Sequence, residues 1–250
     1  MAGRLEGKVS IVTGASSGQG RVAAERFARE GAKLVLADID EEGLAQVDVI
    51  VREAGAESAL YVGDLTEESA NEAMVATAID TFGRLDAIYN VAGLVRFGAA
   101  HDVSLEDWDF TLKFELTITF LACKHAIRAM RNNGGGSIIN VSSGSGLKGV
   151  PNHAAHTATK MGIIGFTRHV AVQYGPDGIR CNAIAPGFLA YGEGQRRVRQ
   201  ATLREYEGGV PLGRFTKPED TAACAAFLAS DDASFITGQV ISVDGGASVT

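Results

Sequence analysis

Short, nearly continuous apolar runs alternate along this chain with longer amphipathic stretches. The runs are rich in β-branched residues, and seven are predicted as strands: KVSIVTG, AKLVLAD, ALYVGD, LDAIYNVAG, GSIINVSS, IRCNAIAPG and GQVISVDGG. The stretches between them are predicted as helices at 18–30, 41–54, 67–82, 104–132, 153–175 and 217–229. Such alternation is typical of βαβ units, in which helices cover both faces of a parallel sheet. The pattern predicts a doubly wound α/β fold with a seven-stranded parallel sheet.

One segment, residues 188–212, interrupts the alternation between a strand and the last helix. Ligands of open α/β sheets bind beyond the carboxyl ends of the strands, and this segment follows such an end. Long insertions usually have a use, so we expect a lid over the ligand, with a plain surface excursion as the alternative. No linker, repeat or low-complexity tract divides residues 1–250, so we expect one domain.

The composition is that of a globular protein. The chain has 250 residues, 46% hydrophobic and 21% charged, which is enough apolar material for one large core. Its three cysteines lack paired or metal-ligand spacing, so we expect no metal and a reducing, cytoplasmic location. No run approaches the roughly 18 apolar residues of a membrane span. The net charge of -7 disfavours a nucleic-acid surface, so a soluble protein acting on small molecules is expected.

A glycine-rich turn follows the first predicted strand. The segment TGASSGQG, residues 13–20, ends that strand and opens the first helix. Gly14, Gly18 and Gly20 allow the backbone to turn tightly and approach a pyrophosphate, whose charge is met by free N–H groups at the helix N-terminus. The glycine pattern alone is weak evidence for a dinucleotide site. Here it lies between a predicted strand and a predicted helix, which is the context that dinucleotide binding requires, and this strengthens the prediction. The sequence therefore predicts a Rossmann-type dinucleotide-binding domain.

An acidic residue ends the second predicted strand. Asp38 lies 18 residues after Gly20, where a carboxylate can accept hydrogen bonds from both adenosine ribose hydroxyls and repel the 2′-phosphate of NADP. No basic residue follows it directly. The alternative is that Asp38 caps the next helix, a role that Asp40 fits better. These residues predict NAD as the cofactor rather than NADP.

Together these motifs resemble the short-chain dehydrogenase/reductase family, and the resemblance covers essentially the whole chain. The matching segments are TGASSGQG at 13–20, GDLT at 63–66, NVAG at 90–93, the Pro-Gly pair at 186–187 and VDGG at 243–246, with Val91 departing from the NNAG pattern of the family. The resemblance implies cofactor contacts at Gly14, Ser17, Gly18, Gln19, Gly20, Asp38, Asp64, Leu65, Asn90, Ala92, Gly93, Lys160, Pro186, Gly187 and Leu189.

The resemblance also implies an active site at four positions, two of which depart from the family pattern. Ser143 matches the serine that hydrogen-bonds a substrate oxygen, and Lys160 matches the lysine that binds the nicotinamide ribose. His156 stands where the family has its catalytic tyrosine. Glu115 stands where an asparagine usually helps to carry a water-linked proton path. We therefore expect these four residues to form the catalytic set.

The histidine changes the acid/base chemistry that is expected. A free phenol has a pKa of about 10, whereas a free imidazole has one of about 6.5. The Lys160 ammonium favours neutral imidazole, which accepts a proton from an alcohol, while a nearby Glu115 carboxylate favours the imidazolium that protonates a ketone. Because imidazole is shorter than phenol, one bridging water is needed unless the backbone or the substrate shifts.

Three functions are compatible with these residues. The leading hypothesis is an NAD(H)-dependent oxidoreductase that interconverts a secondary alcohol and a ketone. The first alternative is a lyase, an isomerase or a carbon-carbon double-bond reductase that uses His156 and Glu115 as an acid/base pair. The second is an NAD-binding protein in which the change at position 156 has impaired catalysis.

Further residues bear on the substrate side of the site. His153 precedes Lys160 by seven residues, a spacing similar to that of tyrosine and lysine in the enoyl-reductase branch of the family; because it lies at a predicted helix start, a capping or solvent-facing role is favoured. Tyr191 stands where the family often has a threonine against the nicotinamide carboxamide. The expected cleft lining is Phe97, Leu147, Val150, Phe188 and Tyr191. Such a lining suits an apolar or cyclic alcohol or ketone.

Self-association is also expected. The segments 104–132 and 153–175 resemble the long helices by which members of the family pair, and the C-terminal segment resembles their second interface. Apolar faces of this size rarely stay exposed. We therefore expect a homotetramer.

Overall fold

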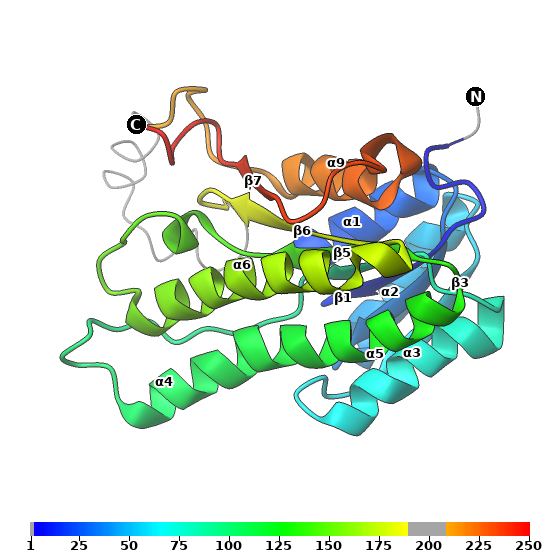
Figure 1. The fold of residues 1–250 in the computed structure, drawn as a ribbon, viewed down its shortest axis with the longest axis horizontal. Coiled ribbons are helices and arrows are strands. Elements are labelled where there is room, and N and C mark those ends of the chain that lie inside the picture. The colour runs from blue at the N-terminus through cyan, green and yellow to red at the C-terminus, as the bar shows by residue number, and fades with distance from the viewer. Residues whose placement is uncertain (1–2, 190–208) are drawn as a thin grey trace.

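Seven parallel strands form the sheet. In the computed structural model, which describes residues 3–189 and 209–250, their order is β3-β2-β1-β4-β5-β6-β7 (Figure 1). The strands are β1 (Val9–Thr13), β2 (Lys33–Asp38), β3 (Ser58–Val62), β4 (Ala87–Asn90), β5 (Gly136–Val141), β6 (Ile179–Pro186) and β7 (Val240–Val243). Every pairing between neighbours is parallel. The predicted doubly wound α/β fold is confirmed, and the strand order reverses between β1 and β4.

Helices cover both faces of this sheet (Figure 1). One layer holds α1 (Gly18–Arg29), α2 (Glu41–Glu53) and α9 (Pro218–Ala229), and the other holds α3 (Glu68–Phe82), α5 (Ile118–Asn132) and α6 (Ala154–Tyr174). Short 3₁₀ turns lie at η2 (Gly144–Gly146), η3 (Gly175–Asp177) and η4 (Asp231–Ala233). Each of the six predicted helices thus has a counterpart, with ends that differ by a residue or two.

The predicted helix at 104–132 is interrupted, which corrects the prediction of one continuous helix. α4 (Leu105–Thr111) runs into a π-helical turn, η1 (Leu112–Thr117), before α5 begins. A single π turn is too short to change an average period of 3.6 residues, so the apolar pattern does not reveal it. Such turns occur frequently at functional sites, and this one contains Glu115.

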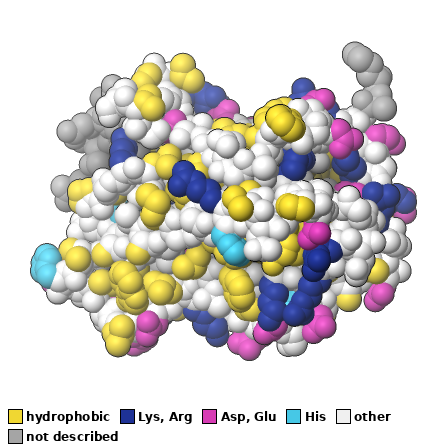
Figure 2. Space-filling view, in the orientation of Figure 1, with side chains coloured by type: hydrophobic (Ala, Val, Ile, Leu, Met, Phe, Trp, Pro, Cys, Tyr) yellow, Lys and Arg dark blue, Asp and Glu magenta, His cyan; other side chains and the backbone are white. Residues whose placement is uncertain are grey.

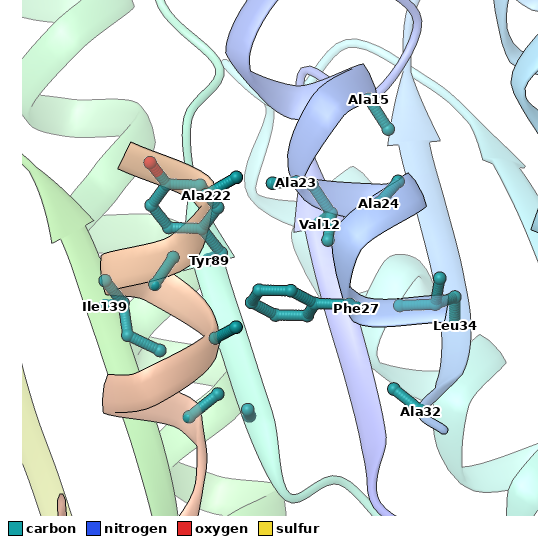
Figure 3. Packing of buried hydrophobic residues seen from close by; sticks show 14 of the residues in the cluster. Val12, Ala15, Ala23, Ala24, Phe27, Ala32, Leu34, Tyr89, Ile139 and Ala222 are labelled. Atoms are coloured by element: carbon teal, nitrogen blue, oxygen red, sulfur yellow. The ribbon is translucent and has the colours of Figure 1, made fainter. Parts of the chain in front are cut away.

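A buried cluster lies between the sheet and each helical layer. On the side of α1 and α9, the rings of Phe27 and Tyr89 stack with centroids 6.4 Å apart (Figure 3). On the side of α3, α5 and α6, Met74, Ile88 and Met130 are fully buried. Burying one such side chain contributes roughly 1.5–3 kcal/mol. These clusters fix the central strands, from whose carboxyl ends the candidate site residues extend.

The edge of the sheet is less covered than its centre. All residues of β1 and β4 are buried, as their continuous apolar runs predict. In the edge strand β3, Leu60 and Val62 are 38% and 45% exposed. Helices therefore cover both faces of the central strands, whereas the edge strand β3 stays partly exposed.

The predicted lid at 188–212 lies largely outside the described residues, and Tyr191 lies wholly outside them. Where the chain is described again, Thr216 pairs with Leu189 in an isolated parallel bridge. In residues 3–189 and 209–250, no helix is long and apolar enough to cross a membrane.

Candidate active site

A cleft of about 950 Å³ lies beyond the carboxyl ends of the strands. It extends from the turn between β1 and α1, past the ends of β4 and β5, to the first turns of α6. The predicted site residues that line it are Gly14, Ser17, Gly18, Gln19, Asp38, Asp64, Leu65, Ala92, Gly93, Glu115, Ser143, His156, Lys160, Pro186, Gly187 and Leu189. Gly20 and Asn90 are not part of this lining. Both are buried, and Asn90 donates a hydrogen bond to Asn140 Oδ1 at 2.8 Å.

The turn after β1 has glycine where no side chain fits. Gly14 has a φ of 66°, and a Cβ there would lie 3.0 Å from the backbone nitrogen of Ala92. A Cβ at Gly20 would lie 2.0 Å from the carbonyl oxygen of Gly14. Helix α1 begins at Gly18 without a side-chain cap from Ser17 and without an acidic residue in its first turn. Its free N–H groups and this backbone cradle fit the pyrophosphate of a dinucleotide.

Asp38 lies at the end of β2 and lines the same cleft. Its Oδ2 accepts a hydrogen bond from the Ser16 N–H at 3.0 Å, and its Oδ1 accepts one from the Ile39 N–H at 2.7 Å. Asp40, rather than Asp38, caps α2 by accepting from the Gly43 N–H at 3.1 Å, as the sequence favours. The bonds from Ser16 and Ile39 fix the Asp38 carboxylate, which can accept hydrogen bonds from ribose hydroxyls and would repel a phosphate.

Thr13 joins the ends of β1 and β4, a contact that the sequence interpretation missed. Its Oγ1 accepts hydrogen bonds from the N–H groups of Val91 and Ala92 at 3.0 and 3.1 Å. The available signal was a hydroxyl at the first position of TGASSGQG. The contact fixes the NVAG segment beside the glycine-rich turn, at the point where the strand order reverses.

Glu115 is the centre of the second half of the site. Both of its oxygens lie 2.9 Å from Nδ1 of His156. Lys160 Nζ lies 3.3 Å from Oε1, and Thr159 Oγ1 lies 2.5 Å from Oε2. The glutamate comes from the π-helical turn and its three partners come from α6. The structure therefore places a carboxylate between the imidazole and the ammonium.

The surroundings of Glu115 favour its ionised form. The side chain is only 5% exposed, and burial by itself would raise the pKa. The charge of Lys160 and the hydrogen bonds from His156 and Thr159 outweigh burial, and they hold the pKa of Glu115 below its ordinary value of 4.5. Because ionised Glu115 accepts the Nδ1–H of His156, Nε2 is the basic nitrogen of the neutral ring. Nε2 has no hydrogen-bond partner among the described residues, and His156 lines the cleft.

Ser143 borders the cleft just after β5. Its Oγ accepts hydrogen bonds from the Ser145 N–H at 3.2 Å and from the Ser145 hydroxyl at 2.9 Å. In the described part of the chain it makes no hydrogen bond to His156. The hydroxyl proton of Ser143 is therefore available to an oxygen of a bound molecule.

Comparison with known proteins identifies the family. The family model described as enoyl-(acyl carrier protein) reductase matches residues 14–248. A 2-(S)-hydroxypropyl-CoM dehydrogenase of Xanthobacter autotrophicus is 38% identical over 252 residues, which span 98% of each chain. A trans-4-hydroxycyclohexanecarboxylate dehydrogenase of Sinomonas cyclohexanicum is 37% identical over 97% of this chain and 93% of its own.

Two solved structures share the fold over nearly the whole length. A putative short-chain dehydrogenase/reductase from Burkholderia xenovorans has a TM-score of 0.95 and 35% identity, covering 100% of this chain and 99% of its own. The chain belongs to the short-chain dehydrogenase/reductase family. A 7α-hydroxysteroid dehydrogenase complexed with NADH and 7-oxo glycochenodeoxycholic acid has a TM-score of 0.93 and 28% identity, covering 97% of this chain and 95% of its own. This member of the family therefore has dehydrogenases and reductases as relatives.

Three of the rings that line the cleft in this family member lie close together. The Phe97 ring lies 4.4 Å from that of His153 and 5.7 Å from that of His156, between centroids. The sequence favoured a capping or solvent-facing role for His153. The residue precedes α6 without a side-chain capping bond, so the capping role is wrong; its ring lines the cleft, and its Nδ1 bonds to the Pro151 carbonyl at 2.7 Å. The His153 ring packs against the Phe97 ring at an interplanar angle of 50°.

The expected substrate lining is present in part. Phe97, Val150 and Phe188 line the cleft, whereas Leu147 lies outside the lining. Phe215, which sequence interpretation missed, lines the cleft with its ring 5.2 Å from that of Phe188. No local signal marks Phe215, because it reaches the cleft through the pairing of its neighbour Thr216 with Leu189.

Proposed function

We propose that this protein is an NAD(H)-dependent oxidoreductase that transfers hydride between nicotinamide and a secondary alcohol or ketone, with His156 as the acid/base group. The observation that supports this most directly is the contact of His156 Nδ1 with both oxygens of buried Glu115. A carboxylate on Nδ1 selects the tautomer whose Nε2 accepts a proton, and it stabilises the imidazolium that results. The dyad thus supplies the acid/base function that the family assigns to tyrosine.

The residues of the first half of the cleft fit a nicotinamide dinucleotide. Family membership and the NADH-bound relative support this class of cofactor. The glycine turn and the N-terminus of α1 would hold the pyrophosphate, and Asp38 would accept the ribose hydroxyls. The Asp38 carboxylate favours NAD over NADP because it would face a 2′-phosphate. Lys160 lines the cleft. Its ammonium bonds to the Val141 carbonyl at 3.1 Å and contacts Glu115 Oε1 at 3.3 Å, which leaves one N–H donor for the nicotinamide ribose.

Bound nicotinamide supplies the hydride acceptor or donor. In the oxidation direction, Nε2 of neutral His156 takes the hydroxyl proton of the alcohol, directly or through one water. Glu115 and the imidazolium then form an ion pair in a site that is largely closed to solvent, since the two side chains are 5% and 13% exposed. In the reduction direction, the imidazolium returns this proton to the substrate oxygen. Ser143 donates its hydroxyl to the same oxygen.

The substrate is proposed to be an apolar or cyclic alcohol or ketone. The rings of Phe97, Phe188 and Phe215 line the cleft and offer flat apolar surfaces. Two relatives support this class, since one is named for a hydroxycyclohexane carboxylate and the other was solved with an oxo steroid acid.

The proposal is tested by replacing the acid/base group. His156→Ala is expected to lower kcat about 100-fold to 10,000-fold while NADH affinity stays unchanged, because general acid/base catalysis contributes factors of this size. The matched control is His101→Ala, because His101 is 82% exposed on the surface and should leave kcat unchanged. His156→Tyr should change the pH profile. An unaltered profile would contradict the proposal.

A panel of alcohols and ketones separates the rival functions. Turnover with a change in nicotinamide absorbance supports the oxidoreductase. Product formation without that change identifies a lyase or isomerase that uses the His156 and Glu115 dyad. NADH binding without any product identifies a catalytically impaired binding protein.

We also propose that the protein assembles as a homotetramer. Figure 2 shows hydrophobic side chains gathered on the face formed by α4, α5 and α6. Leu105, Phe120, Met161 and Val172 on these helices are between 44% and 82% exposed. Covering such a face removes apolar surface from water. Light scattering at micromolar concentration should report a tetramer, and a monomer would contradict the proposal.

A further inference from the structure

Thr159 lies against the carboxylate of Glu115, although the mechanism above does not use it. Its side chain is fully buried, so its hydroxyl must be satisfied by protein groups rather than by bulk water. Two acceptors are within reach: Oε2 of Glu115 at 2.5 Å and the carbonyl oxygen of His156 at 2.9 Å. A hydroxyl has one proton, and the shorter contact to an ionised acceptor is the stronger bond.

We propose that Thr159 is a positioning residue, which holds the Glu115 carboxylate in the orientation that His156 requires. The inference rests on the proposed function, because it assigns Thr159 a part in the same proton transfer. Lys160 holds Oε1 and Thr159 holds Oε2, so the carboxylate is fixed at both oxygens while each oxygen stays 2.9 Å from Nδ1. A carboxylate held on one side only is free to rotate away from the ring.

The residue type suits this task. Threonine is β-branched and therefore has few side-chain rotamers on a helix, so its hydroxyl direction is well defined. Thr159 stands on α6 three residues after His156, and both reach the π-helical turn that contains Glu115. The titratable groups that contact Glu115 among the described residues are His156 and Lys160, both from α6. Thr159 is the remaining hydrogen-bond donor to this carboxylate in the described part of the chain.

A purely structural role is the competing explanation. Helical threonines commonly return a hydrogen bond to a carbonyl of the preceding turn. Thr221 on α9 is such a case: it is fully buried, and its hydroxyl donates to the Pro218 carbonyl three residues earlier at 2.9 Å. It matches Thr159 in burial and in this local bond, but among the described residues its hydroxyl makes no hydrogen bond to a carboxylate. Thr221→Val therefore serves as the control for the loss of a helical back-bond.

The first experiment compares Thr159→Val, Thr159→Ser and Thr221→Val with the wild type in turnover. Thr159→Val keeps the shape but removes the donor, and it is expected to lower kcat about tenfold with KM little changed. The pH below which kcat/KM falls through protonation of Glu115 should rise by up to about one unit, because this carboxylate binds its own proton more tightly once it loses a donor. Thr159→Ser keeps the donor but lacks the methyl group that restricts its rotamers, so it should restore most of both losses, and Thr221→Val should alter neither.

The second experiment needs no turnover. Infrared difference spectra of the cofactor-free protein on acidification report the protonated carboxyl band of Glu115, assigned by its loss in Glu115→Gln. The midpoint pH at which this band appears should rise in Thr159→Val, return in Thr159→Ser and stay constant in Thr221→Val. Melting temperatures recorded alongside show whether each variant folds.

The outcomes separate the two proposals. If the wild type has no redox turnover, the proposed function fails while the infrared midpoints still decide the role of Thr159. Thr159→Val with wild-type midpoint and wild-type kinetics overturns the inference. So does an equal loss in Thr159→Val and Thr221→Val, or a failure of Thr159→Ser to restore the midpoint and the profile, since either result assigns Thr159 to packing alone.

Discussion

The nucleotide end and the proton-transfer end of the cleft are built in different ways. At the nucleotide end, the backbone of one short segment, residues 13–20, makes the cradle, and the absence of side chains at Gly14 and Gly20 is what permits it. At the proton-transfer end, side chains meet across 41 residues between Glu115 and His156 and across 44 between Glu115 and Thr159. One end therefore depends on local backbone shape and the other on tertiary contacts.

This difference predicts opposite sensitivities. The nucleotide end should respond to added volume, because close-packed backbone has no space to yield. The proton-transfer end should tolerate changes that keep shape but respond to any change in charge or in hydrogen-bond donors. The substitutions below test this contrast in order of expected effect.

The largest effect is expected from adding one methyl group to the glycine turn. Gly20→Ala places a Cβ 2.0 Å from the Gly14 carbonyl oxygen, so the loop must move. We expect the free energy of unfolding to fall by about 3 kcal/mol and NADH binding to be largely lost. Chemical denaturation and a fluorescence titration with NADH measure the two effects.

Gly165→Ala is the matched control for that change. Gly165 is also helical, within α6, but a Cβ there would meet nothing within 4 Å. Alanine in a helix is more favourable than glycine by roughly 0.5–1 kcal/mol, so a slight stabilisation is expected. Equal losses in Gly20→Ala and Gly165→Ala would break the contrast between the two ends.

An intermediate effect is expected from neutralising Glu115 without changing its size. At neutral pH, Glu115→Gln is expected to lower the free energy of unfolding by about 2 kcal/mol, because hydrogen bonds to a charged group are lost. Because the pKa of Glu115 lies below 4.5 in the folded protein, the stability from its ionised form is present above that pH and is lost as the pH falls through the lower value. Denaturation curves should show that the difference in free energy of unfolding between the wild type and Glu115→Gln becomes smaller below pH 4.5. If this difference in free energy of unfolding stays constant on acidification, the result would contradict an ionised, hydrogen-bonded Glu115.

The smallest effect is expected at Asp38. Asp38→Asn removes the charge but keeps the size, so the preference for NAD over NADP should fall about tenfold, or about 1.4 kcal/mol, as repulsion of the 2′-phosphate is lost. Calorimetric titrations with both nucleotides measure the ratio. Asp40→Asn is the control, since it keeps an acceptor for the Gly43 N–H at the α2 cap. Unchanged discrimination in Asp38→Asn would assign the preference to other residues.

The sequence by itself determined the parts of this protein that follow from local rules. Strand and helix identity follows from hydrophobic period, so the seven-stranded parallel sheet was predictable. The glycine turn and the Asp40 cap follow from backbone sterics and short-range hydrogen bonds, which act within a few residues. Membership of the short-chain dehydrogenase/reductase family was visible in the order of the motifs.

Only the tertiary structure decided how the charged groups of the site meet. The π-helical turn at 112–117 leaves the average period of the hydrophobic pattern unchanged, so the sequence pattern did not predict where this turn places Glu115. The sequence suggested that Glu115 assists His156. The same carboxylate also contacts Lys160 and Thr159, and these contacts depend on the packing of η1 against α6. Such contacts are set by the distance and direction between elements far apart in the chain, and these are quantities that residue spacing does not encode.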